Sequence, residues 1–411
     1  SLDTSHRAYS PMYQLLIWLL LETEEYQRAF IFARQYENRT SYTIYSLFSL
    51  GSQLRSARKF ELATRSYQYY TDSQSDALKA RALDELSKSY LEWGEFQLDN
   101  NLQTATTPET PFDNSYRAGE ELIQSFPNYE QIGDVYSRLI DISVDIYKDL
   151  ERAKTWFRDM QNRPQLQIPA YLLYAEGRIA LFEKDFTRAR QALTRAERQS
   201  DETNLSEKAR YFLSLSDFFS EDYEFAEVQL KSMERRTSSY YANDAIKLRM
   251  WIKNGMRADT TGQVLDAVSR SMYQLHTGKY EEAMTEAEPL LATSGNTFAD
   301  DLVLEFSTRL PTTYDAVILK LLNHVIEAQP TSPVRERLLW DRAALIEERS
   351  ETGWSTAIST NPFTFLESDT VPSYSEEELV ALYEEMLMEY PDGFYANYIR
   401  EKLRTLESRS I

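Results

Sequence analysis

The chain of 411 residues has no cysteine, which excludes disulfide bonds, thiolate metal sites and cysteine nucleophiles. It has only 11 glycines and 13 prolines, so little of it suits the tight turns of a β-sheet protein. Histidine occurs three times, at His6, His276 and His324, and no two of them share a helical spacing. Because metal sites and histidine-based catalysis need several converging groups, we expect neither a bound metal nor a catalytic histidine.

Positive charge is also scarce. The 45 Lys and Arg residues face 65 Asp and Glu residues, which gives a formal net charge of -20. Such a surface repels phosphate backbones and anionic head groups, so nucleic acid is not an expected partner. The apolar run from Leu15 to Leu21 is too short to span a bilayer, so we expect no membrane insertion. The first residue is Ser1, which fits removal of an export signal or another truncation, and we expect the former.

Signatures of catalysis are missing from the sequence. It contains no glycine-rich phosphate loop, no nucleophile elbow of the GxSxG type and no HExxH motif. Its carboxylate clusters, such as Glu281–Glu282, stand where helices are predicted to begin and favour the positive end of the helix dipole. We therefore predict that the chain is not an enzyme and binds no cofactor.

Apolar side chains are plentiful. Hydrophobic residues make up 42% of the chain and aromatic residues 13%, with 28 Tyr and 19 Phe, which is enough to build a core. The apolar pattern has a period of about 3.6 residues along nearly all of the sequence, the period of an α-helix. The sequence therefore predicts an all-α fold.

A repeated pattern organises the chain. The stretches KFELATRSYQYY from Lys59 and DFTRARQALTRA from Asp185 share an aromatic residue, two variable residues, an alanine and then apolar residues at helical spacing. The small residue recurs, often 34 to 37 residues apart, at Ala29, Ala63, Ala153, Ala189, Ala226, Ala283 and Val317. An aromatic residue or leucine stands three positions before each, at Tyr26, Phe60, Leu150, Phe186, Tyr223, Tyr280 and Tyr314. Alanine lets two antiparallel helices approach closely, and we expect the aromatic residue to close the turn between them.

This pattern resembles the tetratricopeptide repeat (TPR), a helical hairpin with a period of 34 residues. The best matches are Leu50, Gly51, Phe60, Ala63, Tyr67 and Tyr70, followed by Gly177, Phe186, Ala189, Leu193 and Ala196. The resemblance implies a right-handed α-solenoid of about eight to nine degenerate hairpins with a C-terminal capping helix. We expect an N-terminal array over 1–236, with an inserted loop at 97–115, and a C-terminal array over 237–411. The second array would contain an elbow helix at 238–255, an insertion at 350–375 and the cap helix at 394–406.

The C-terminal sequence is similar to the ends of exported TPR proteins of Bacteroidetes-type bacteria. That resemblance implies an exported, periplasmic or extracellular location, although a cytoplasmic one stays open. Two short stretches, Asp259-Thr260-Thr261 and Asp369-Thr370-Val371, resemble the O-glycosylation motif of such bacteria. Thr260 and Thr370 are therefore possible glycosylation sites.

In TPR arrays the first helix of each hairpin lines a concave groove. By register with the best matches, the groove residues would be Tyr45, Phe48, Ser52 and Arg55 in one unit and Tyr171, Tyr174, Arg178 and Phe182 in another. Tyr and Arg are effective anchors for peptides and partner proteins. Ordinary packing is the competing interpretation, because Tyr is abundant throughout the chain.

The first predicted helix is unusually apolar. The seven residues of Leu15 to Leu21 cover a helix on all sides, yet the first unit of an array has only one neighbour. The first ten residues, a curl of the array or another subunit would have to cover the second side. Our hypothesis is head-to-tail self-association into rings or filaments. It would run through Leu15, Leu16, Trp18, Leu19 and Leu20.

Two functions follow from these observations. The first is a non-catalytic exported scaffold that mediates protein–protein interaction and assembles with copies of itself. The alternative is a monomeric envelope adaptor that captures a peptide or protein partner in the concave Tyr/Arg groove.

Overall fold

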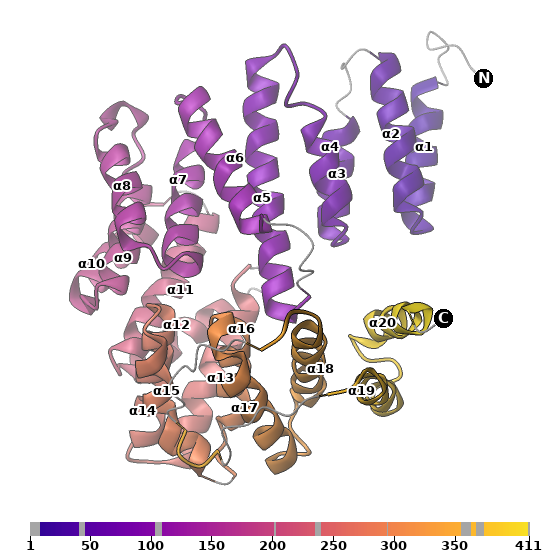
Figure 1. Cartoon of the computed structure of the whole chain (residues 1–411). Helices are drawn as coiled ribbons and strands as arrows, with labels where there is room; N and C mark the ends of the chain where they lie inside the picture. The colour runs from indigo at the N-terminus through magenta and orange to yellow at the C-terminus, as the bar shows by residue number, and fades with distance from the viewer. Residues whose placement is uncertain are drawn as a thin grey trace. The chain divides into compact units, whose positions relative to one another are not determined.

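The computed structural model describes residues 9–40, 46–102, 109–200, 203–234, 240–293, 295–354, 363–366 and 374–409. All regular secondary structure in these ranges is helical, and within each of two units successive helices pack on one another (Figure 1). The chain divides into two compact units, Ser1–Ala175 and Glu176–Ile411. The boundary that we expected at 236/237 therefore lies inside the second unit. The predicted all-α class of tandem helical hairpins is confirmed.

Unit 1 holds eight helices and the beginning of a ninth. They are α1 (Tyr9–Glu22), α2 (Tyr26–Thr40), α3 (Ser46–Ser56), α4 (Phe60–Gln68), α5 (Asp76–Asn100), α6 (Pro111–Ser125), α7 (Ile132–Asp141), α8 (Leu150–Gln161) and α9 (Pro169–Phe182). From α1 to α8 each helix packs against the next, and α2 also contacts α4. A short π-helical turn, Ile142–Ile146, links α7 to α8.

Unit 2 holds the end of α9 and the remaining helices. They are α10 (Phe186–Gln199), α11 (Thr203–Phe219), α12 (Tyr223–Glu234), α13 (Ala242–Ala258), α14 (Gln263–His276), α15 (Tyr280–Ala292), α16 (Ala299–Arg309), α17 (Asp315–Ala328), α18 (Arg335–Thr352), α19 (Glu376–Glu389) and α20 (Ala396–Arg409). The extra helix expected at 238–255 corresponds to α13, and the cap helix expected at 394–406 corresponds to α20. Because α11 contacts α14 directly, α13 is an addition to the hairpin series and packs on α12 and α14.

The repeated sequence pattern marks the second helix of each hairpin. All six alanines of the series are fully buried, and Val317 is 4% exposed. Six of the seven residues that precede them by three positions are the first residue of a helix, and Tyr314 is the N-cap of α17. The small residue therefore lies one turn into the helix, where a side chain of one carbon lets the preceding helix come close.

The turns inside these hairpins share one backbone conformation. Glu24, Arg58, Lys148, Lys184, Glu221 and Gly278 all have positive φ and stand two positions before the residue that opens the next helix. In the first of these turns the amide of Glu25 donates to the carbonyl of Leu20 at 2.8 Å, as in a Schellman motif. Five of the six positions hold a residue with a side chain, although glycine adopts this conformation at lower cost.

The first predicted insertion is shorter than expected. Helix α5 continues to Asn100 and α6 begins at Pro111, so the loop predicted at 97–115 wrongly included residues of both helices. The helix ends have local causes: Asn101 takes a left-handed conformation after α5, and Thr110 forms a capping box with Asp113 before α6. The backbone amide of Asn101 and the side chains of Thr110 and Asp113 satisfy backbone groups that the helix ends leave open.

The second predicted insertion lies between α18 and α19. Residues 350–352 of the predicted range belong to α18, and the described stretch 363–366 is anchored in unit 2: Phe363 is buried and its ring lies 6.4 Å from that of Phe306. Phe365 packs on His324, and the Thr364 hydroxyl donates to Glu288 at 2.7 Å. Among all helices of the described ranges, none combines the length and apolar character needed to cross a membrane.

Candidate functional site

The groove residues predicted in unit 1 have different surroundings. Phe48 is buried, its ring stacks on Tyr70 with centroids 4.3 Å apart, and the Arg81 guanidinium lies 4.5 Å from its centroid. Ser52 is exposed and Arg55 is partly buried, whereas Tyr45 lies outside the described residues. Phe48 therefore serves the packing of the hairpin, and Arg55 is the predicted residue that takes part in a polar cluster.

The groove residues predicted on α9 are largely core residues. Tyr171 and Tyr174 are buried, and the Tyr174 hydroxyl donates to Asp141 at 2.8 Å. Arg178 is 0% exposed, and its guanidinium lies 3.4 Å from the ring centroid of Phe212. Phe182 keeps partial exposure. Ordinary packing thus accounts for Tyr174 and Arg178, whose side chains do not reach the surface.

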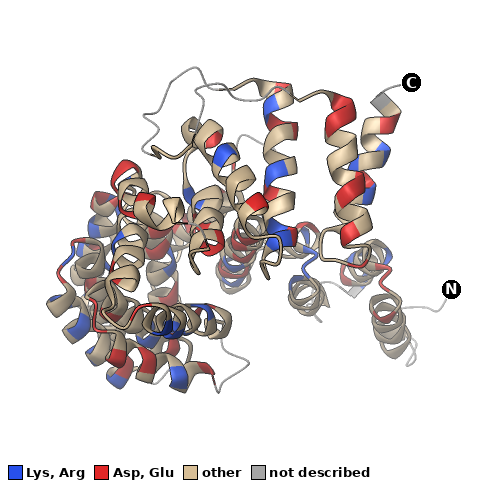
Figure 2. Cartoon of the chain, turned by 90° about the horizontal axis from the view of Figure 1, so that it is seen from below, with Lys and Arg blue, Asp and Glu red and all other residues tan. Residues whose placement is uncertain are grey.

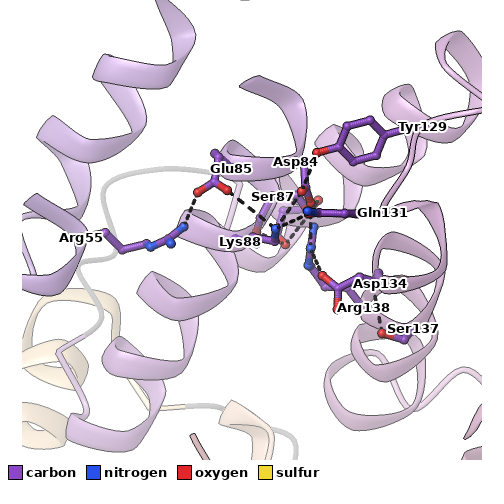
Figure 3. A network of polar contacts seen from close by, with 11 residues as sticks. Arg55, Asp84, Glu85, Ser87, Lys88, Tyr129, Gln131, Asp134, Ser137 and Arg138 are labelled. Atoms are coloured by element: carbon purple, nitrogen blue, oxygen red, sulfur yellow. Dashed lines mark hydrogen bonds and ion pairs between the residues drawn. The ribbon is translucent and has the colours of Figure 1, made fainter. Parts of the chain in front are cut away.

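A polar network connects three helices of unit 1 (Figure 3). Asp84 of α5 is at its centre: it pairs with Lys88 at 2.7 Å and with Arg138 of α7 at 3.0 Å. Arg138 also pairs with Asp134 at 2.8 Å, one helical turn away. The Tyr129 hydroxyl donates at 3.0 Å to Oδ2 of Asp84, the oxygen that also pairs with Lys88.

The network extends to α3 through Arg55. Its guanidinium lies 2.9 Å from Glu85 and 3.5 Å from Glu92, both on α5. Lys88 lies 3.7 Å from Glu85 and donates to the side-chain oxygen of Gln131 at 3.3 Å. First helices of three successive hairpins, α3, α5 and α7, are thereby linked by charged side chains.

Burial sets the electrostatics of this network. Arg138 is 3% exposed, and although burial opposes its charge, Asp84 and Asp134 outweigh burial and raise its pKa. Burial, followed by Asp84, raises the pKa of Tyr129, so its hydroxyl stays protonated and keeps donating. Burial also raises the pKa of Glu92 despite the opposing charge of Arg55. Each cation of the network pairs with carboxylates of this chain. The network is therefore a structural link between hairpins and not a vacant ligand site.

A second candidate surface lies on α1. Four of its large apolar side chains face solvent: Met12 is 40% exposed, Leu15 63%, Trp18 53% and Leu19 50%. We call these four residues the α1 face. No Lys, Arg, Asp or Glu occurs between Tyr9 and Leu21, and the helix that follows the N-terminus is drawn almost entirely in tan (Figure 2).

The opposite side of α1 is well packed. Tyr9 and Tyr13 are buried, with ring centroids 4.9 Å apart, and Tyr13 stacks on Tyr36 of α2 at 5.2 Å. Leu20, which we had grouped with the self-association residues, is also buried, and Leu16 is partly buried. Helix α1 is therefore held by α2 on one side and presents Met12, Leu15, Trp18 and Leu19 on the other.

The predicted modification sites are partly described. Thr260 is exposed in the turn between α13 and α14, next to Asp259, whose side chain accepts from the amide and hydroxyl of Thr261. Hydrogen bonds from Thr261 lower the pKa of Asp259. Thr370 lies outside the described residues.

Comparisons with known proteins add little to this picture. No family model matches the chain, and no curated protein matches it in sequence. Among solved structures the chain is similar to the crystal structure of the P58(IPK) TPR domain at 2.5 Å. The identity is 12%, 97% of this chain and 98% of that chain are covered, and the TM-score is 0.23. A TM-score this low carries no argument, so the fold class rests on the helices themselves.

Proposed function

We propose that the chain is a non-catalytic scaffold that binds proteins, and that copies of it associate through the α1 face. The supporting observation is the exposure of Met12, Leu15, Trp18 and Leu19 on a helix segment without charge. Exposed apolar patches of a few hundred Å² on soluble proteins are commonly interaction sites. Burying such a patch is worth roughly 25 cal/mol per Å².

The architecture favours a scaffold over an enzyme. Arrays of helical hairpins offer extended surfaces on which partner proteins bind. The buried charged cluster around Asp84 and Arg138 is occupied by its own ion pairs. Neither feature supplies an acid, a base or a nucleophile beside an open cavity, which is what a catalytic role requires.

The alternative, a monomeric adaptor with a Tyr/Arg groove, has less support. It relied on all eight predicted groove residues, among them Tyr174 and Arg178. Both side chains are buried, one against Asp141 and the other against Phe212. Arg55 is partly exposed, but it is engaged with Glu85 and Glu92.

Sedimentation of the purified chain tests self-association. We expect the weight-average mass of the wild type to rise with concentration, and Trp18→Glu to stay monomeric at every concentration, because a carboxylate in the α1 face must lose its hydration to be buried. The matched control is Phe225→Glu on α12, where the native side chain is 62% exposed but lies outside the α1 face. This control should behave as the wild type does. A wild type that remains monomeric throughout contradicts the proposal.

Export remains part of the proposal and rests on the sequence resemblance alone. Fractionation of the native organism would place the protein outside the inner membrane if the proposal is correct. Intact-mass measurement on the same material tests glycosylation at Thr260 and Thr370, for which an excess over the mass of the sequence is expected.

A further inference from the structure

We infer that the partner of the α1 face is the α1 face of a second copy, related by a twofold axis with the two helices antiparallel. This inference rests on the proposed self-association and specifies its geometry. It replaces the head-to-tail arrangement that the sequence suggested with a closed dimer. Three observations carry it: the chemistry of the C-terminal helix, the distribution of charge and the spacing of the α1 face.

A head-to-tail contact needs an apolar acceptor on the opposite end of the array, and α20 does not offer one. The apolar side chains of α20 that are buried, Ala396, Ile399 and Leu406, face inward. Every exposed side chain described in this helix is polar: Asn397, Glu401, Arg404, Thr405, Glu407 and Ser408. Burying the α1 face there would desolvate charged groups without partners.

Two exposed apolar side chains do lie near the C-terminus, Met388 of α19 at 77% and Phe394 before α20 at 44%. Met388 stands beside the exposed Glu385 and Glu389, and the ring of Phe394 packs on Tyr395, so a second apolar helix there would meet charge.

The exposed apolar pair on α12 is also a poor acceptor. Phe225 and Val228 stand one turn apart on α12, but the exposed Glu224 precedes them and Glu227 lies between them. Glu227 is moreover engaged with Arg249 at 3.4 Å. A second α1 face is free of such charges, so two of them can be buried together without loss of an ion pair.

Net charge points to the same partner. Each copy carries a formal charge of -20, so two copies repel each other over most of their surfaces. The repulsion is weakest where both surfaces lack charge, because the Debye length is about 8 Å at physiological salt. The α1 face is such a surface, and the carboxylate closest to it in the sequence is Glu22 at the end of the helix.

The position of Glu22 favours the antiparallel orientation. With the twofold axis between Leu15 and Leu16, the two Glu22 residues lie about 20 Å apart along the helices, from a rise of 1.5 Å per residue. In a parallel pair they would lie side by side at about 8 to 10 Å, the usual distance between packed helices. Antiparallel helices also bring opposite ends of their dipoles together.

The spacing of the face suits this axis. Met12, Leu15 and Leu19 are separated by three and four residues, which is the spacing of a helix–helix seam. Under the twofold axis, Met12 of one copy meets Leu19 of the other, and Leu15 meets the partly buried Leu16. Each contact then occurs twice, as an isologous interface requires. A standard interface buries roughly 800 Å² per partner over 20 to 30 residues, and the α1 face has four, so we expect a dissociation constant on the order of micromolar.

Cysteine cross-linking tests the geometry, because the chain has no native cysteine. The variants are Met12→Cys and Leu19→Cys in the full chain, oxidised alone and as an equal mixture, then separated on a denaturing gel without reductant. We expect a covalent dimer from the mixture and its loss when either variant is oxidised alone. In the antiparallel pair two copies of residue 12 are offset by about 10 Å along the helix, beyond the ~7 Å between Cα atoms that a disulfide allows.

Other outcomes separate the inference from the function on which it rests. Covalent dimers from each variant alone would show a parallel pair and overturn the inference while self-association stands. Wild-type species larger than a dimer, without cross-linking in the mixture, would restore the head-to-tail arrangement. A wild type that is monomeric in sedimentation at every concentration would mean that another part of the chain or a different protein covers the face, and would overturn both.

Discussion

At the scale of single residues, the hairpin turns carry a conformational cost that can be measured. Glu24 has a φ of 58° in the turn between α1 and α2, a region that a residue with a side chain enters at about 1–2 kcal/mol. Its side chain is exposed. The turn therefore depends on the backbone conformation at residue 24 more than on the exposed glutamate side chain.

We therefore expect Glu24→Gly to raise the free energy of unfolding of the chain by about 0.5–1 kcal/mol, less than the full conformational cost because glycine also gains entropy in the unfolded state. Chemical denaturation measures the change. Glu24→Ala is the control, since it removes the same charge and keeps the strained conformation. Equal stability of the two variants would contradict this account of the turn.

Three aspartates of unit 2, Asp217 and Asp315, which are buried, and Asp301, which is partly buried, give the chain a dependence on pH. Asp301 accepts a hydrogen bond from the Trp251 indole at 2.8 Å, and burial raises its pKa from 3.8 to about 6, although Lys247 opposes the shift. Burial likewise raises the pKa of Asp217 and of Asp315 to about 6. Because the pKa of Asp301 is higher in the folded chain than in the unfolded chain, protonation of Asp301 stabilises the fold. This contribution is complete below pH 3.8 and is lost as the pH rises through about 6.

Asp301→Asn should remove this dependence at one site. The amide still accepts from Trp251 but does not ionise, so we expect the variant to be about 1–2 kcal/mol more stable than the wild type at pH 7.5. At about pH 3, below the unfolded pKa of 3.8, the carboxyl is neutral in both states, and the two proteins should be equally stable. Denaturation at both pH values provides the measurement, and a constant difference between the proteins would rule out titration of Asp301 as the cause.

At the scale of elements, the link between α5 and α7 should dominate the stability of unit 1. Removing Arg138 leaves the buried Asp84 without one of its two cationic partners, and breaking a buried pair in this way costs about 3–5 kcal/mol. We expect a loss of that size in the free energy of unfolding for Arg138→Gln. The matched control is Arg117→Gln, whose pair with Glu109 is exposed on both sides and should cost less than about 1 kcal/mol. Similar losses for both variants would contradict the role assigned to the network.

The elements also show what the sequence could predict. Alanines such as Ala63 and the aromatic residues before them located the hairpins, because close helix packing and turn closure both depend on local spacing. The polar network was missed beyond Arg55. The pairs Asp84–Lys88 and Asp134–Arg138 have the same i,i+4 spacing as exposed helix pairs, and their burial comes from a contact 54 residues apart.

Tyr174 and Arg178 were predicted to line the groove, but both side chains are buried, for a related reason. Their register on α9 followed from the repeat, but their burial depends on Asp141 and Phe212, which other helices contribute. The loop predicted at 97–115 was too long because its sequence is polar throughout. That polarity gave no sign of the last turn of α5 or of the capping box of α6. The apolar first helix, in contrast, was readable from composition alone, and its exposure is visible at Leu15 and Trp18.

At the scale of the whole molecule, an acidic chain is proposed to meet its own copy through a face without charge. The repulsion between copies falls as salt shortens the Debye length, from about 10 Å at 0.1 M to about 3 Å at 1 M. Hydrophobic burial is not weakened by the same change. Self-association should therefore strengthen with salt, whereas an interface held by ion pairs would weaken.

Sedimentation of the wild type and of Trp18→Glu, over a range of concentrations and at low and high salt, tests self-association through the α1 face most directly. The account predicts that the wild-type mass rises from one chain toward two, at lower concentration when salt is high, and that the variant remains a single chain. A wild type that stays monomeric under all conditions, or a Trp18→Glu variant that associates as strongly as the wild type, would contradict it.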